Sequence, residues 1–225
     1  MKAGNAHYRD ISDLPEVVPV FPLAGALLLP GSRLPLNIFE PRYVSMIDQA
    51  LAGRRIIGMI QPRLNLPHSE AGAAAPELAG MGCIGRLVSM AETGDGRYLV
   101  ALEGICRFRV GEELPLGTAF RQCRILPIAA DLQEDRSAGK IDRAKLLRTL
   151  RAYLDANELT ADWQSFLRAE NDVLVNGLSM MAPYGAAEKQ ALLEAPDLLA
   201  RAETLIAITE MVLAGGKGDS DQTLQ

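Results

Sequence analysis

The sequence predicts an α+β protein in which a β-rich part comes first and a bundle of helices follows. Short apolar runs broken by Pro and Gly fill the chain as far as residue 128, as expected of strands and turns. From residue 141 onward, apolar residues instead recur at helical spacing. A polar stretch at 129–139, AADLQEDRSAG, separates the two patterns, and we expect the boundary between two subdomains there.

Composition and charge limit the class of protein. With 225 residues, of which 48% are hydrophobic and 23% charged, the chain has an ordinary globular composition and enough length for a sizeable core. Its net charge of −5 argues against nucleic acid as a partner. The N-terminus has no apolar signal core and no run reaches the length of a membrane span, so we expect a cytoplasmic protein with no membrane partner.

The cysteines and histidines favour neither a disulfide nor a metal site. Cys83, Cys106 and Cys123 are odd in number, widely spaced and set in apolar, strand-like contexts, which predicts buried free thiols. There is no C-x-x-C motif, and His7 and His68 fall in segments that look loose. We therefore expect no metal and no cofactor.

The stretch 18–43, VPVFPLAGALLLPGSRLPLNIFEPRY, is apolar but interrupted by proline. Its prolines are Pro19, Pro22, Pro30, Pro35 and Pro41. Because proline lacks an amide donor and fixes φ, no continuous helix or central strand can run through the stretch, and several very short strands are predicted. Pro41 suits the first turn of a helix, which the spacing places at 42–51 with Gly53 as its cap. A short buried strand is expected at 55–60.

The next part of the chain is predicted to be a loop followed by strands. Residues 62–82 are rich in Ala, Gly and Pro and indicate a long surface loop, for which a plain insertion is favoured over a functional role. Residues 83–92 and 97–110 form a predicted hairpin across a T-G-D-G turn. Gly104 suggests a bulge or bend in its second strand. One further strand is expected at 118–128.

The C-terminal part reads as helices. They are expected at 141–154, in a short helix capped by Thr160, at 172–181, at 186–193, and from Pro196 to Gly215. The predicted domains are a β-rich subdomain at 14–128 and a helical bundle at 138–214, with flexible tails at 1–13 and 215–225.

Three blocks of the sequence resemble one family. The first is P-x-F-P-L followed by L-L-L-P-G-x-x-L-P-L-N-I-F-E-P-R-Y, and the second is GCIGRL with a later L-x-G-x-x-R-F. The third joins L-x-N at 174–176, EKQALLE at 188–194 and an arginine, Arg201, near the start of the last helix. Together they resemble the Lon N-terminal, substrate-binding domain of the peptidase S16 family, and more closely the bacterial proteins that consist of that domain alone.

The resemblance implies a fold and a function. The fold would be a β-rich, PUA-like pseudo-barrel followed by a compact helical bundle. Since this domain contributes to substrate recognition and oligomer assembly in Lon, the resemblance implies a non-catalytic module that binds unfolded or exposed protein segments by apolar contact and strand addition. The PUA label also invites an RNA-binding interpretation, but the sequence has no basic strip with interleaved aromatics.

The chemistry of a full Lon protease is not expected here. The sequence has no G-x-x-x-x-G-K-[ST] phosphate loop, and none of its lysines lies in a context that resembles the serine–lysine peptidase dyad. With two histidines in expected loops, a Ser-His-Asp arrangement has little to draw on. We therefore expect a protein that is not an enzyme.

Charged and large apolar side chains within apolar runs are the candidates for a peptide- or partner-binding site. The arginines would donate to a bound peptide backbone, and the apolar side chains would line a groove. In the alternative interpretation, the charges pair with one another and the apolar residues belong to the core. The candidate residues are Phe39, Glu40, Arg42, Tyr43, Met46 and Arg107.

Two other functions remain open at this point. The chain could be an adaptor or regulator of a separate ATP-dependent protease, with the loop at 62–82 or the helical face making the contact. It could also be a small-molecule-binding protein or an uncharacterised enzyme that uses a cleft between the subdomains. The expected partners are unfolded protein segments, with a protease or a chaperone as the alternatives, and the expected state is a monomer or weak homodimer.

Overall fold

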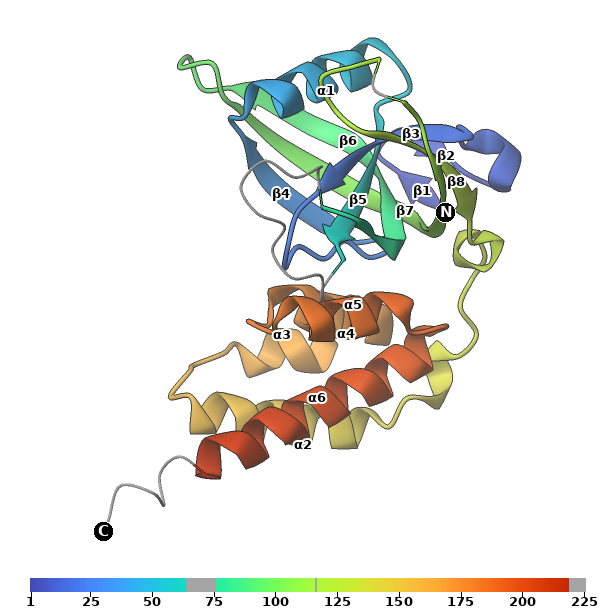
Figure 1. Cartoon of the computed structure of the whole chain (residues 1–225). Helices are drawn as coiled ribbons and strands as arrows, with labels where there is room; N and C mark the ends of the chain where they lie inside the picture. The colour runs from blue at the N-terminus through green and yellow to red at the C-terminus, as the bar shows by residue number, and fades with distance from the viewer. Residues whose placement is uncertain (64–75, 116, 219–225) are drawn as a thin grey trace. The chain divides into compact units, whose positions relative to one another are not determined.

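The computed structural model describes residues 1–63, 76–115 and 117–218 (Figure 1). Packing divides the chain into two compact units. The first, which we call the sheet unit, comprises Met1–Glu134 and Pro183–Leu193, and the second, the helical unit, comprises Asp135–Ala182 and Glu194–Gln225. The expected domain bounds of 14–128 and 138–214 stay predictions, but in the structure the segment 183–193 groups with the sheet.

The two units differ in their elements. The strands of the sheet unit are β1 Lys2–Ala3, β2 Ala6–His7, β3 Val17–Pro22, β4 Arg33–Ile38, β5 Ile56–Pro62, β6 Leu78–Glu92, β7 Tyr98–Glu113 and β8 Gln122–Pro127. Its helices are α1 Pro41–Ala52, α5 Ala186–Glu194 except for the last residue, and the short η1 Ile11–Asp13 and η2 Ala129–Leu132. The helical unit contains η3 Ala138–Lys140, α2 Arg143–Ala156, α3 Trp163–Arg168, α4 Asn171–Met181 and α6 Leu198–Gly218.

The main sheet curls into a partly closed barrel. Its strand order is β4-β7-β6-β5-β3-β8, and an additional pairing of β7 with β8 closes a ring from which β4 is left out. Every pairing is antiparallel except that of β3 with β5. Together with the helices that follow it, this arrangement confirms the predicted α+β class with a pseudo-barrel and a helical part.

Strand β7 is the longest and joins the parts of the barrel. Its first half pairs with β4, its end pairs with β8, and β6 runs along most of its length. The register with β6 shifts where Ile84 pairs with Cys106 but Gly85 pairs with Gly104, so the predicted irregularity at Gly104 is confirmed. A Cβ atom on Gly104 would collide with the Leu29 carbonyl oxygen, and only glycine allows this close approach.

The proline-rich opening stretch forms short pairings, as predicted. Strand β3 pairs with β8 only over Val17–Pro19 and with β5 only over Val20–Pro22. It thus lies inside the sheet order, which the sequence argued against. The prolines are tolerated because β3 divides its pairing between two neighbours instead of forming a full ladder with either.

The N-terminal residues differ from the expected flexible tail. Strands β1 and β2 form a hairpin, and Ala3, Tyr8 and Leu14 are buried in the core cluster of the sheet unit. The amino group of Met1 donates to the carbonyls of Tyr8 at 3.0 Å and Leu132 at 3.2 Å. The few apolar residues in this polar segment are spaced so that they cover the barrel.

In the helical unit, α2 and α4 both pack against α6. The cap of α3 is Asp162 and not the expected Thr160: its Oδ1 accepts from the N–H groups of Gln164 at 3.0 Å and Ser165 at 3.3 Å. A carboxylate in this position also interacts favourably with the helix dipole, which explains why the aspartate is used.

Several other predictions can be compared with the described residues. Cys83, Cys106 and Cys123 are free and buried, as predicted. Of the expected loop at 62–82, residues 64–75 lie outside the described residues, whereas 78–82 belong to β6. Of the expected C-terminal tail, residues 219–225 also lie outside the described residues. Over the part of the chain that the structure describes, no helix has both the length and the apolar character needed to cross a membrane.

Candidate functional site

The candidate residues at the start of α1 form a small exposed surface. Pro41 is the first residue of α1 and Glu40 is its N-cap, so the chain turns sharply after β4 and leaves the Phe39 side chain 61% exposed. The Arg42 guanidinium forms an ion pair with Glu40 at 2.7 Å and lies over the Tyr43 ring, 4.5 Å from its centroid. Both charged side chains remain about half exposed.

The next two candidates on α1 are core residues. Tyr43 is 7% exposed and packs on Phe21, with ring centroids 4.2 Å apart. Burial raises the pKa of the Tyr43 hydroxyl, an effect that the nearby Arg42 opposes. Met46 is fully buried. Amphipathic spacing placed these two side chains on one face of α1, and the structure turns that face inward.

The last candidate, Arg107, is buried and held by an internal ion pair. Its Nε donates to Asp131 Oδ2 at 2.8 Å and its Nη2 to Asp131 Oδ1 at 2.7 Å, while Nη1 donates to the Leu193 carbonyl at 3.2 Å. Glu103, the acidic residue that precedes Arg107 in β7, pairs with Arg33 at 3.3 Å. The structure therefore does not bring Arg107 to a surface where a peptide backbone could accept its hydrogen bonds.

Strand alternation failed at Arg107 for a physical reason. In a strand with one solvent-exposed face, Cys106 and Phe108 would point inward and Arg107 outward, but all three are buried, so both faces of β7 are covered here. The outer face is occupied by η2, which supplies Asp131, and by the end of α5, which supplies the Leu193 carbonyl. Two segments distant in sequence are thus fastened to the barrel by one guanidinium.

A buried glutamine fastens the start of α5 in a similar way. Gln61 is 2% exposed, and its Oε1 accepts from the Gly25 N–H at 2.9 Å. Its Nε2 donates to the Ala186 carbonyl at 2.9 Å and to Gln190 Oε1 at 3.2 Å. Sequence reasoning missed this residue, because a glutamine at the end of an apolar run carries no signal of a distant partner.

The exposed surface near Phe39 continues onto strands β4 and β7. Phe39 follows β4 directly, and in β7 Leu99, which pairs with Asn37 of β4, is 50% exposed. Sequence reasoning missed Leu99 because the pairing of β4 with β7 joins segments that are far apart in the chain. We define Phe39, Glu40, Arg42 and Leu99 as the β4-end surface.

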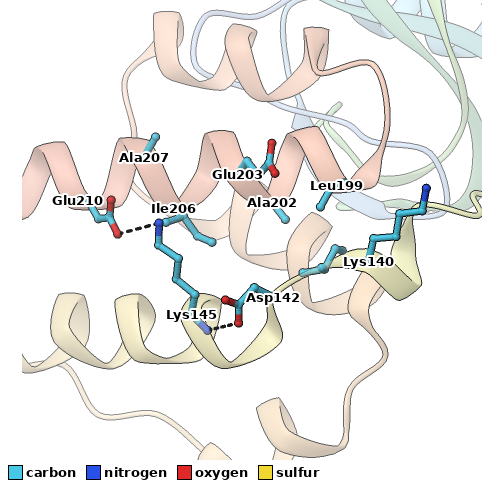
Figure 2. Close-up of a pocket in the computed structure, with 10 residues that line it drawn as sticks. Lys140, Asp142, Lys145, Leu199, Ala202, Glu203, Ile206, Ala207 and Glu210 are labelled. Atoms are coloured by element: carbon cyan, nitrogen blue, oxygen red, sulfur yellow. Dashed lines mark hydrogen bonds and ion pairs between the residues drawn. The ribbon is translucent and has the colours of Figure 1, made fainter.

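The helical unit contains a cavity of about 230 Å³ between the start of α2 and α6 (Figure 2). Ile141, Ala202 and Ile206 are among its apolar lining residues, and Lys145 Nζ lies 3.5 Å from Glu210 Oε1 across it. Both partners of this pair are about half exposed, so the cavity is an open groove between two packed helices. Among the residues that the structure describes, no group of His, Cys, Asp and Glu could hold a metal ion.

Comparison with known proteins places this architecture in a family. The model of the ATP-dependent protease La (LON) substrate-binding domain matches residues 17–210. Among curated proteins, Lon protease 2 of Myxococcus xanthus is 26% identical over 87% of this chain, and the Lon protease of Parabacteroides distasonis is 30% identical over 88%. The aligned part is 24% of the length of each, so the chain spans about a quarter of these relatives.

Two solved structures share the fold. The N-terminal domain of the Mycobacterium avium complex Lon protease has a TM-score of 0.62 at 19% identity, covering 86% of this chain and 98% of that one. A Lon N-terminal domain protein from Xanthomonas campestris has a TM-score of 0.59 at 20% identity, covering 85% and 97%. With the family model matching most of its length, the chain belongs to the Lon substrate-binding domain family.

Proposed function

We propose that this chain is a non-catalytic module that binds exposed or unfolded segments of other proteins on the β4-end surface. The observation that carries the proposal is the exposure of Phe39, a large aromatic side chain that is 61% accessible beside the half-exposed Leu99. Exposed apolar surface of this kind is typical of protein-binding sites. Membership of a family described as substrate-binding supports the same function.

The charged pair beside Phe39 suits polypeptide binding. The ion pair of Glu40 with Arg42 is about half exposed on both sides, and such a surface pair contributes only about 0–1 kcal/mol. A partner can therefore displace it at little cost. The released guanidinium would donate to a peptide carbonyl or carboxylate, and the released carboxylate would accept from peptide N–H groups.

A binding measurement tests the proposal with a matched control. Fluorescence anisotropy would follow a labelled, reduced and carboxymethylated protein, which stays unfolded in buffer, as the chain is added. Phe39→Ser should weaken binding about tenfold, since burial of a phenylalanine contributes about 1.5–3 kcal/mol. Leu126→Ser is the control, because Leu126 is also 61% exposed but lies on β8.

Equal affinities for the native chain and Phe39→Ser would contradict the proposed site. Absence of binding by the native chain at any concentration tested would contradict the proposed function. The adaptor function makes a different prediction: the chain would then change the rate at which a purified ATP-dependent protease degrades a substrate, and Phe39→Ser would abolish that change. The hypothesis of a small-molecule binder or enzyme stays a prediction.

A further inference from the structure

We propose that the bound segment adds as an extra strand along the free edge of β4, so that the ligand class is an extended, uncharged stretch of polypeptide with apolar side chains at alternate positions. This inference rests on the proposed function and specifies its binding mode. Among the described residues, β4 stands at the end of the sheet order and pairs only with β7, from Arg33 opposite Glu103 to Ile38 opposite Tyr98.

The backbone groups on the free edge can be assigned from the register. The Gly104 N–H donates to the Ser32 carbonyl at 2.9 Å, and this pair continues the β4–β7 ladder by one step. In an antiparallel ladder, alternate residues direct both backbone groups toward the partner. Leu34 and Leu36 therefore face β7 with their N–H and C=O groups, whereas Arg33, Pro35 and Asn37 direct theirs toward the free edge.

The position of Pro35 agrees with this assignment. Proline has no N–H group, so it fits a position whose backbone points away from the neighbouring strand. The free edge consequently offers the N–H groups of Arg33 and Asn37, and the carbonyls of these two residues and of Pro35. All three of these residues are exposed. The edge thus presents a row of donors and acceptors that matches the backbone of an extended chain.

Side chains along β4 indicate what the added strand would bury. Ile38 is 1% exposed, but Leu34 and Leu36, which share its face of the strand, are only half-buried. A neighbouring strand would cover these two leucines with the side chains of its own alternate residues. Phe39 and Leu99 lie at the end of the edge on the opposite face, where they would contact the other side chains of the bound segment.

The distribution of charge argues for an uncharged segment. Arg33 at the start of the edge pairs with Glu103 at 3.3 Å, and Arg42 beyond its end pairs with Glu40 at 2.7 Å. The residues from Leu34 to Phe39 carry no charge. Because the charges at both ends are compensated, the edge offers neither an acidic nor a basic segment a net attraction. A strand of this length spans about 20 Å and would pair with about six residues of the ligand.

Backbone methylation provides the test. The probe is a capped peptide of about eight residues that alternates Val with Ser, matched to the length of β4. Two derivatives carry N-methyl groups on either the odd or the even amides, which changes the same number of groups in each. Since an added strand directs only alternate N–H groups toward its partner, one derivative should lose at least about tenfold in affinity while the other stays near the parent peptide.

Variants of β4 test the same edge from the side of the protein. Asn37→Pro removes an outward donor and should weaken peptide binding about fivefold, whereas Pro35→Ala adds one and should strengthen binding by a similar factor. Asn37→Ala keeps the N–H group and serves as the control. A melting temperature equal to that of the native chain would establish that each variant is folded.

The outcomes separate the inference from the function on which it rests. Equal affinities of the two methylated peptides, with Phe39→Ser still weakening the unfolded protein, would overturn strand addition and leave the proposed function intact. Failure of both the peptides and the unfolded protein to bind would overturn both. A concentration-dependent dimer that Asn37→Pro dissociates, without peptide binding, would assign the edge to a second copy of the chain and overturn the inference.

Discussion

The sheet unit and helix α3 of the helical unit are stabilised by different kinds of contact. In the sheet unit, buried polar side chains join segments far apart in the chain, as Arg107 does with Asp131 and Leu193. In the helical unit, α3 contains no buried residue, although the structure describes all of it. The sheet unit therefore depends on a few contacts that cannot be replaced locally, whereas α3 depends on how its two ends are capped.

Each end of α3 is capped by a side chain from outside the helix. Asp162 caps its N-terminus. At the other end, Arg143 Nη2 donates to the carbonyls of Phe166 at 2.7 Å and Ala169 at 2.8 Å, and its Nη1 donates to Asn171 Oδ1 at 2.6 Å. A cation at a helix C-terminus satisfies free carbonyls and interacts favourably with the dipole. We expect α3 to unfold locally when this contact is removed.

The largest effect is expected from breaking the buried ion pair of the sheet unit. Asp131→Ala leaves the Arg107 guanidinium buried without its main partner and should lower the free energy of unfolding by about 3–5 kcal/mol. Urea unfolding would measure this change in the free energy of unfolding. The control is Glu16→Ala, since Glu16 pairs with Arg124 at the surface and its loss should cost about 0.5 kcal/mol or less. Similar losses in the two variants would contradict the view that burial makes the Arg107–Asp131 pair the stronger contributor.

A slightly smaller effect is expected where two backbones touch. Gly104→Ala would force a Cβ atom against the Leu29 carbonyl oxygen, and we expect a loss of about 3 kcal/mol. Gly80→Ala, also in the sheet unit, is the control because no heavy atom lies within 4 Å of the added Cβ. Calorimetric unfolding should separate the two variants by many degrees. Equal melting temperatures would mean that the loop carrying Leu29 can move away.

In the helical unit, Arg143→Ala should cost about 2 kcal/mol, because it removes charge-assisted hydrogen bonds to the end of α3. Trp163, the single tryptophan of the chain, lies in α3 and reports on it by fluorescence. We expect the emission of Trp163 to shift to the red. We also expect the backbone amides of α3 to lose protection against hydrogen exchange, while those of the sheet unit keep theirs. Arg148→Ala, at an exposed position of α2, should leave the emission unchanged.

The smallest effect of a single group is expected at alkaline pH. Burial, followed by the nearby Asp131 carboxylate, raises the pKa of Cys106 to about 12, and burial also raises the pKa of Cys123 to about 11. In the unfolded chain these thiols ionise at a pKa of about 9, whereas in the folded chain they stay protonated to higher pH. The free energy of unfolding is therefore unaffected below about pH 9 and falls as the pH rises above it. Between pH 8 and 10 we expect the sheet unit to lose about 1 kcal/mol for each of these two thiols.

Urea unfolding at the two pH values would measure the alkaline loss. Cys106→Ala removes one of the titrating thiols and should reduce the slope of stability against pH. Because Cys83, Cys106 and Cys123 all lie in the sheet unit, the Trp163 signal of the helical unit serves as the internal control. An unchanged slope in the variant would show that other groups cause the alkaline loss.

Local signals predicted the elements well where a single turn or cap decides the outcome. Pro41 and Gly53 bound α1 as expected, and the T-G-D-G turn joins β6 to β7 as expected. The predicted helix capped by Thr160 exists, but its cap is Asp162, since two polar residues close together both suit a cap and the choice depends on the path of the chain. Such errors shift a boundary without changing the fold.

The candidate site was predicted less completely. Phe39, Glu40 and Arg42 do lie together on an exposed surface, because they are consecutive or nearly so in the chain. Arg107 was placed with them, yet it is buried on Asp131, and alternation along one strand carries no information about what covers its outer face. Leu99 was missed for the related reason that its neighbour Asn37 is remote in sequence.

By itself the sequence determined the order of strands and helices, the family and the position of the exposed turn between β4 and α1, because these depend on residues within a few positions of one another. Only the tertiary structure decided that β7 closes the ring with β8, that β4 is left at an edge, and that Arg107 and Gln61 fasten remote segments. Each of these depends on which distant groups meet when the chain closes on itself, and a buried polar group can be satisfied by many partners of equal chemistry.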